Sequence, residues 1–86
     1  IFFYYLQNYL QTIAFNVKQP AKVTINIYNL KGQLIKTLIN NELLYGEHKV
    51  VWDGTDNLGN NIGSGVYLYK MQLNGYSKTK KMLLLK

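Results

Sequence analysis

The sequence predicts an all-β domain, an immunoglobulin-like antiparallel β-sandwich of about seven short strands. Apolar and polar residues alternate over several segments, as they do on strands with one buried face. Turn-forming residues recur roughly every 8–12 positions, and no segment has a convincing helical pattern. The chain has 86 residues and no cysteine, so we expect one domain with a modest core and neither disulfides nor thiolate metal sites.

The first half of the chain contains two clearly alternating strands, over residues 11–17 and 22–28. Their inward-facing positions are apolar: Ile13, Phe15, Val17, Val23, Ile25 and Ile27. The segment Gln19-Pro20-Ala21 separates the two strands, because proline cannot donate a ladder hydrogen bond. Residues 1–9 are aromatic and form either a linker or a first-strand segment, and residues 10–86 form the sandwich.

A hairpin turn at residues 29–32 leads to a return strand over residues 33–39. We expect Leu34 and Leu38 to be its core contacts. A short helix over residues 34–44 is the competing interpretation, which Asn40-Asn41 interrupts.

The second half is organised around a strand, a loop rich in glycine and asparagine, and a second strand. Val50 and Trp52 share one face of the first strand, which ends at Asp53. Residues 66–73 form a long strand on which Tyr67, Tyr69, Met71 and Leu73 share one face, and Val66 and Leu68 share the other. Apolar residues on both faces at its start predict an interior strand. Asn74-Gly75 predicts a type I′ turn into a last strand over residues 76–86. On that strand Met82 and Leu84 face inward, and lysines line it at Lys78, Lys80, Lys81 and Lys86.

The net charge of +6 comes entirely from lysine, because the chain has no arginine. Nucleic-acid binders usually need arginine for bidentate contacts, so we expect no nucleic-acid partner but a diffuse attraction for anionic partners. The apolar opening over residues 1–6 is too short to span a membrane or to act as a signal peptide. Since the first residue is Ile1, we expect the chain to be part of a larger protein, with any export signal upstream.

The loop offers oxygen ligands at close spacing, from Asp53, Asp56, Asn57 and Asn60. A calcium site is one interpretation, but the spacing is not that of an EF-hand loop and no glutamate closes it. Side-chain capping of turns explains the same residues more simply, so we predict no metal site and no cofactor. His48 has no recognisable nucleophile or orienting acid in a known motif, so we predict that it is a packed or edge histidine and that the chain is not an enzyme.

Two surface features have both a structural and a functional interpretation. Tyr67, Tyr69 and Tyr76 resemble a stacking platform for sugars, but we favour core and sheet-surface positions for them. The lysine-lined last strand is either a protected sheet edge or an electrostatic recognition strip. Composition alone does not separate these two interpretations.

Four segments in order resemble one known family. These are residues 23–32 (VTINIYNLKG), residues 43–54 (LLYGEHKVVWDG), residues 64–69 (SGVYLY) together with Asp56 and Gly59, and residues 81–86 (KMLLLK). The set resembles the type A C-terminal sorting domain of type IX (Por) secretion, which is related to the immunoglobulin-like domain of the flagellar hook-capping protein. The resemblance covers roughly residues 6–86, and the ordered set is more specific than any single motif.

This resemblance implies a non-catalytic sorting signal. Its partners are the outer-membrane translocon, a sortase-like peptidase and an upstream cargo domain of the same chain. The implied location is the periplasm in transit, then the cell surface or the medium. By matching motif positions, the implied recognition residues are Gly65, Val66, Tyr67, Lys81 and Lys86, although Gly65 and Tyr67 have a purely structural alternative.

One departure weakens the match at the start of the chain. Family members commonly carry a Pro-Asn-Pro stretch after Asn-Tyr, whereas Asn8-Tyr9 runs directly into Leu10 and Gln11. The alternative function is a structural or adhesive immunoglobulin-like module, either hook-cap-like or a carbohydrate-binding accessory domain.

Overall fold

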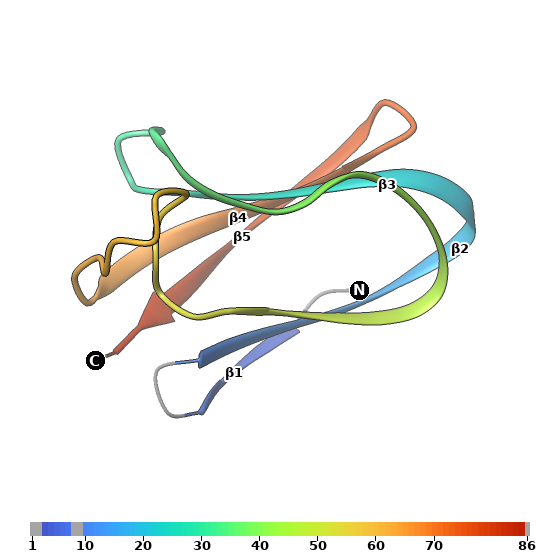
Figure 1. Cartoon of the computed structure of the whole chain (residues 1–86). Coiled ribbons are helices and arrows are strands. Elements are labelled where there is room, and N and C mark those ends of the chain that lie inside the picture. Colours follow the sequence, from blue (N-terminus) through green and yellow to red (C-terminus); the bar gives the residue numbers. More distant parts are fainter. Residues whose placement is uncertain (1–2, 8–9, 86) are drawn as a thin grey trace.

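The computed structural model describes residues 3–7 and 10–85, with side chains described from residue 11 onward. Over this range the chain forms five strands and every paired neighbour is antiparallel (Figure 1). The strands are β1 (Phe3–Gln7), β2 (Leu10–Tyr28), β3 (Leu34–Trp52), β4 (Gly65–Leu73) and β5 (Tyr76–Leu84). The predicted all-β class and antiparallel sandwich are confirmed.

The two layers of the sandwich share their longest strands. The first half of β2 pairs with β1 and with the end of β3, and its second half pairs with β4 and with the start of β3. β5 extends the second layer by pairing with β4. Figure 1 shows β2 and β3 curving together from one layer into the other at one end of the molecule. The layers are therefore joined by continuous backbone.

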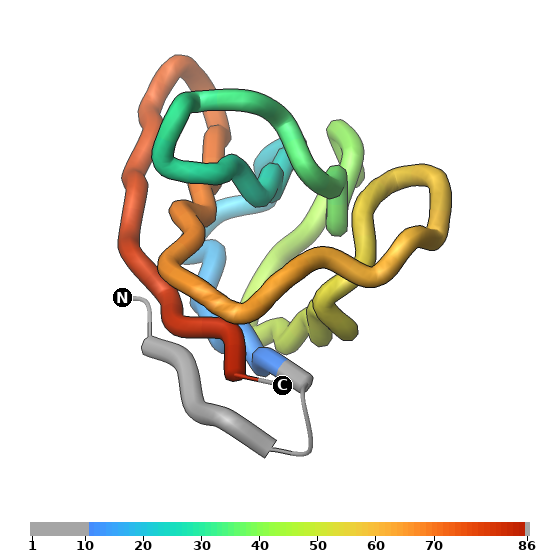
Figure 2. Tube along the Cα trace, turned by 90° about the vertical axis from the view of Figure 1, so that its left-hand side faces the viewer, coloured from blue at the N-terminus to red at the C-terminus, as the bar shows by residue number. Residues whose placement is uncertain are grey.

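The core lies between the layers, where the chain wraps around it (Figure 2). Its buried apolar members come from β2, β3, β4 and β5: Ile13, Phe15, Val17, Ala21, Val23, Ile25, Ile27, Ile39, Trp52, Tyr69, Met71, Met82 and Leu84. The alternation predicted for residues 11–17, 22–28, 66–73 and 82–84 is confirmed. Fully burying each large apolar side chain contributes about 1.5–3 kcal/mol, so this alternating pattern is sufficient to favour the strands.

The chain has fewer strands than predicted because two expected breaks are bulges. Val17 pairs with Gly46 and Ala21 pairs with Leu44, so four steps along β2 match two steps along β3. Pro20 lies within this irregular segment, where no regular ladder hydrogen bond is required of it. On β3, Asn41 has a φ of 53° beside a second register shift. The strands bend at these points instead of ending.

The return strand predicted over residues 33–39 is confirmed as the start of β3, and the competing helix over residues 34–44 is excluded. One of the strand's two predicted core contacts was wrong. Leu38 packs against the core as expected, but Leu34 is 50% exposed and Ile39 is the buried residue. The cause is the set of register shifts, which bring Ile39 opposite the inward-facing Ile25 and Leu34 opposite the outward-facing Tyr28.

Both predicted turns are confirmed. The Asn29 side-chain oxygen accepts hydrogen bonds from the backbone N–H groups of Lys31 (3.0 Å) and Gln33 (2.9 Å). Asn74 and Gly75 have φ angles of 48° and 74°, as a type I′ turn requires. This turn places β4 between β2 and β5, so β4 is the predicted interior strand.

Candidate functional site

The central loop, residues 53–64, directly follows a fully buried aromatic residue, Trp52. The Trp52 indole N–H donates a 2.9 Å hydrogen bond to the carbonyl oxygen of Thr55. Tyr67 packs edge-on against Trp52 with ring centroids 5.3 Å apart. The Tyr67 hydroxyl also donates a 2.7 Å hydrogen bond to the carbonyl oxygen of Gly63. Two aromatic side chains thus fix the start and the end of the loop.

Asp53 caps the first turn of the central loop. One carboxylate oxygen accepts hydrogen bonds from the hydroxyl group (2.6 Å) and the backbone N–H (3.1 Å) of Thr55. The hydroxyl hydrogen bond is the main reason that the pKa of Asp53 is lowered. The carboxylate therefore stabilises the turn in its ionised form.

Asp56 caps the second turn in the same way. Its Oδ1 atom accepts hydrogen bonds from the backbone N–H groups of Leu58 (3.0 Å) and Asn60 (2.9 Å). The hydrogen bond from the Asn60 backbone is the main cause of the lowered pKa of Asp56. The Asp56 carbonyl closes the turn by accepting from the N–H of Gly59, which has a φ of 86°.

The loop is also bound to the start of β3 by hydrogen bonds. The Asn57 N–H donates to the carbonyl oxygen of Ile35, and the Asn57 side-chain oxygen accepts from the N–H of Thr37, both at 3.0 Å. Lys36 donates to the Thr55 hydroxyl (3.3 Å) and to the Asp56 carbonyl (3.2 Å). Sequence reasoning missed Lys36, because its partners lie about twenty positions away and no local pattern connects them.

The four residues considered as calcium ligands thus make hydrogen bonds within the loop or to β3. Asp53 and Asp56 cap turns, Asn57 bonds to β3, and the Asn60 backbone donates to Asp56. Across residues 11–85, His, Asp and Glu form no group of three or more that could hold a metal ion. These hydrogen bonds account for the residue types at Asp53, Asp56 and Asn57.

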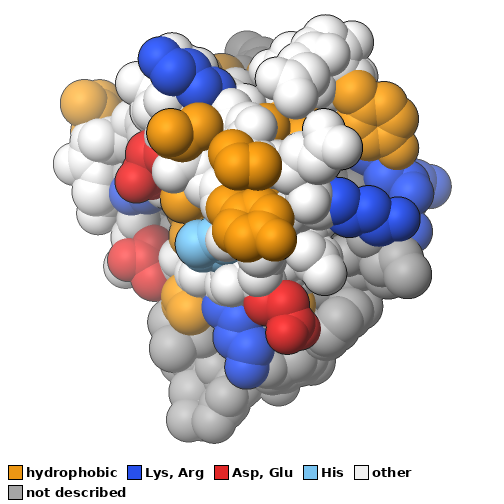
Figure 3. Space-filling model, turned by 90° about the vertical axis from the view of Figure 1, so that its right-hand side faces the viewer, with side chains coloured by type: hydrophobic (Ala, Val, Ile, Leu, Met, Phe, Trp, Pro, Cys, Tyr) orange, Lys and Arg blue, Asp and Glu red, His pale blue; other side chains and the backbone are white. Residues whose placement is uncertain are grey.

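His48 lies against the core strand β2. Its ring stacks on Phe15 with centroids 5.8 Å apart, and its Nε2 atom lies 3.0 Å from the carbonyl oxygen of Tyr45. Neither contact is a nucleophile or an acid, so the packed histidine predicted from the sequence is what the geometry shows. Exposed apolar side chains gather around it on the face where β2 and β3 bend (Figure 3). Leu43 and Tyr45, in this bend of β3, are 68% and 67% exposed.

The three candidate platform tyrosines do not share a surface. Tyr69 is fully buried, Tyr67 packs against Trp52, and Tyr76 is 56% exposed at the β4–β5 turn. A stacking platform of the three is therefore excluded, and the structural interpretation holds for Tyr67 and Tyr69.

The recognition candidates divide into two groups. Val66 and Lys81 are exposed on the outer side of the β4–β5 pair, opposite Leu83 and Leu68 respectively. Tyr67 points inward to Trp52, and Gly65 has a φ of 154° at the start of β4. Lys86 lies outside the described residues. In the described part of the chain, no helix is long and apolar enough to cross a membrane.

Comparisons with known proteins agree with this architecture. The model of the FlgD Ig-like domain family matches residues 8–76. Among solved structures, FlgD from P. aeruginosa is similar in fold, with a TM-score of 0.67 and 23% sequence identity. The match covers 87% of this chain and 60% of that chain, so this chain spans less than two thirds of that FlgD structure. No curated protein matches. Because the family model covers most of the sequence, the chain belongs to the FlgD Ig-like domain family.

Proposed function

We propose that this chain is a non-catalytic structural module that acts as a rigid immunoglobulin-like body in a larger assembly, as a hook-capping-like domain would. The observation that carries the proposal is the bonding of the central loop. The side chains of Asp53 and Asp56 accept hydrogen bonds from the loop backbone, and that of Asn57 accepts one from β3, so these side chains serve the fold. The family match over residues 8–76 supports the same role.

Rigidity follows from how the layers are connected. The bent strands β2 and β3 run through both layers, and the loop after β3 bonds back to the start of β3 in the other layer. Relative sliding of the layers would break these hydrogen bonds and expose the core. A rigid module of this kind would hold the proteins attached to it at a fixed position relative to one another.

A domain exchange tests the structural role. We would replace the Ig-like domain of a FlgD protein with residues 1–86 in a strain that lacks its own copy, and measure swimming. We expect motility above that of a strain whose FlgD has no Ig-like domain. A stable, folded chimera that gives no more motility than the deletion would contradict the proposal.

A second candidate is the C-terminal sorting signal of type IX secretion, with the translocon, the sortase-like peptidase and upstream cargo as partners. The specific observation in its favour is the end of β5, which lies beyond the family-matched residues. There Met82 and Leu84 are buried, whereas Lys81 and Leu83 are exposed on the outer side. This arrangement gives the strand buried anchors and an outer face that a partner could contact. The sorting candidate would carry with it export through the periplasm to the cell surface or medium.

The test of this candidate is export of a reporter fused ahead of residues 1–86 in a type IX host. Deleting residues 81–86 would also remove the buried Met82 and Leu84, so a double variant, Lys81→Gln with Leu83→Ser, is the sharper test. We expect it to reduce export while Lys31→Gln, in the exposed turn before β3, does not. Export of the double variant at the unsubstituted level would sink the sorting candidate.

A further inference from the structure

The second layer carries a hydrophilic outer face on those parts of β2, β4 and β5 that lie nearest the β4–β5 turn, whereas Val66, Leu68 and Leu83 occupy the outer side further from that turn. The strand register aligns three rows of residues across this face: Thr24, Gln72 and Ser77; Asn26, Lys70 and Thr79; Tyr28, Leu68 and Lys81. The inward positions Val23, Ile25, Ile27, Tyr69 and Met71 between these rows are at most 7% exposed. The first two rows thus form a surface of hydroxyl, amide and ammonium groups with no apolar side chain.

The charges on this face have one sign. Lys22, Lys70 and Lys81 cross it on the diagonal, at separations of about 14 Å and about 8 Å for standard strand spacings. None of the four acidic residues lies at a register position on the face. Glu42 is opposite the inward-facing Val23, and the other three are in the first layer or the central loop. Hence no acidic residue of the described chain lies at a register position on the lysine diagonal itself.

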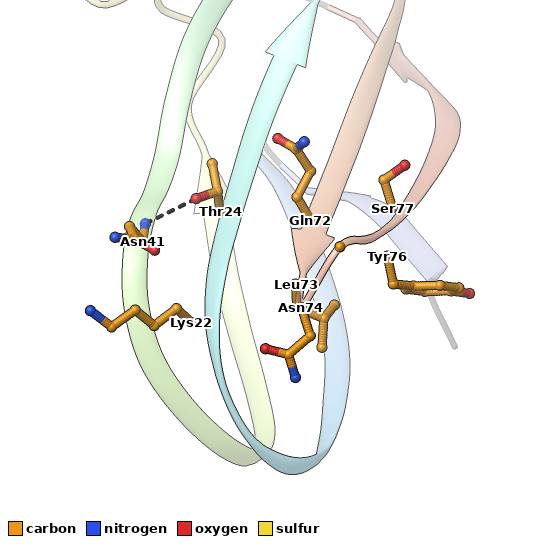
Figure 4. A pocket seen from close by; sticks show the side chains of 9 residues that line it. Lys22, Thr24, Asn41, Gln72, Leu73, Asn74, Tyr76 and Ser77 are labelled. Carbon is orange, nitrogen blue, oxygen red and sulfur yellow. Dashed lines mark hydrogen bonds between the residues drawn. The ribbon is translucent and has the colours of Figure 1, made fainter.

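One end of the face is hollowed into a pocket of about 310 Å³, which is the size of a small ligand site. Figure 4 shows the lining side chains, which come from β2 and β3 (Lys22, Thr24 and Asn41) and from the β4–β5 hairpin (Gln72, Leu73, Asn74, Tyr76 and Ser77). The Thr24 hydroxyl oxygen accepts a 3.0 Å hydrogen bond from the Asn41 backbone, which fixes its position. The pocket therefore combines one cation, several neutral hydrogen-bonding groups, one leucine and one tyrosine.

We propose that this outer face binds an acidic polysaccharide, with a carboxylate-bearing sugar in the pocket near Lys22. Hydroxyl and amide side chains both donate and accept, as sugar hydroxyls require, and the spaced lysines match repeated carboxylates. A protein partner fits less well, because the centre of the face lacks the apolar core of a protein interface. A nucleic acid fits less well, because the chain has no arginine and Tyr76 alone lines the pocket with an aromatic ring.

Isothermal titration calorimetry of the 86-residue chain with polygalacturonate at low ionic strength tests this proposal. The triple variant Lys22→Gln, Lys70→Gln, Lys81→Gln should bind roughly tenfold more weakly. The matched control removes the same charge from exposed positions outside the face, with Lys18→Gln, Lys31→Gln and Lys49→Gln. We expect the control to lose less than about twofold, because these lysines lie away from the diagonal.

A second variant removes hydrogen-bonding groups without changing the charge. Gln72→Ala with Ser77→Ala alters two exposed pocket residues and should weaken binding about threefold. Neutral pullulan should not bind. Equal losses in the two lysine triples, or binding of poly-L-glutamate as tight as that of polygalacturonate, would overturn the proposal. The first result would mean a non-specific attraction, and the second an acidic protein as the partner.

Discussion

Tyr67 joins the central loop to the core through one ring and one hydroxyl group. We predict that Tyr67→Phe lowers the free energy of unfolding by about 1 kcal/mol, because the hydrogen bond to the Gly63 carbonyl is lost while the ring still packs on Trp52. Urea unfolding followed by tryptophan fluorescence measures the change. An unchanged free energy combined with lost activity in the export assay would instead assign Tyr67 to recognition.

Asp53 and Asp56 make the stability of the chain depend on pH. Their folded-state pKa values are lowered by the hydrogen bonds that they accept, so both contribute stability above the unfolded value of 3.8. That contribution is lost as the pH falls through the folded values. We expect the melting temperature to fall on acidification below about pH 4, and to fall less steeply in the Asp53→Asn, Asp56→Asn double variant. If the melting temperature fell equally steeply with pH in the unsubstituted chain and in the double variant, the two carboxylates would not stabilise the fold as caps.

The β4–β5 hairpin depends on a residue that tolerates a positive φ. Gly75 has a φ of 74°, so Gly75→Ala should cost about 1 kcal/mol although no atom would clash with the added methyl group. Gly63→Ala is the matched control, since Gly63 has open space and no positive φ. Denaturant unfolding of both variants checks the difference. Equal losses of unfolding free energy in the two variants would show that the positive φ at Gly75 does not determine the stability of the hairpin.

Short sequence patterns predicted those strands and turns whose formation depends on the residues of the segment itself. Alternation placed the inward residues of β2 and divided those of β4 between two faces, and Asn74-Gly75 predicted its turn, because burial and positive φ are local requirements. The continuity of β2 and β3 was not predictable in this way. A bulge depends on how two distant segments pair, so Gln19-Pro20-Ala21 looks like a break until its partner on β3 is known.

The turn-capping role of the loop residues was predictable from the sequence, but the hydrogen bonds that join the loop to β3 were not. The Asp and Asn residues of the loop were expected to cap turns, and the hydrogen bonds of Asp53 and Asp56 show that they do. The bonding of Asn57 and Lys36 across to the other layer required the fold. The burial of Tyr69 beside the exposure of Tyr76 likewise follows from where β4 and β5 lie in the sandwich, which residue type does not reveal.

The shared strands predict how the whole molecule unfolds. Because β2 and β3 pass through both layers, neither layer can unfold while keeping its longest strands. We expect Trp52 fluorescence and far-ultraviolet circular dichroism to report one coincident, two-state urea transition. Fluorescence follows the surroundings of Trp52, and circular dichroism follows all strands. Separated transitions would mean that the layers are independent units.

We infer that the loop after Trp52 belongs to the scaffold of a structural module, because its carboxylates accept hydrogen bonds from its own turns. The most direct measurement is the melting temperature of the chain in excess calcium and in excess EDTA at the same ionic strength. A ligand that binds only the folded state raises the melting temperature. We predict the same melting temperature in both conditions. A rise of several degrees in calcium that Asp53→Asn and Asp56→Asn abolish would contradict the claim.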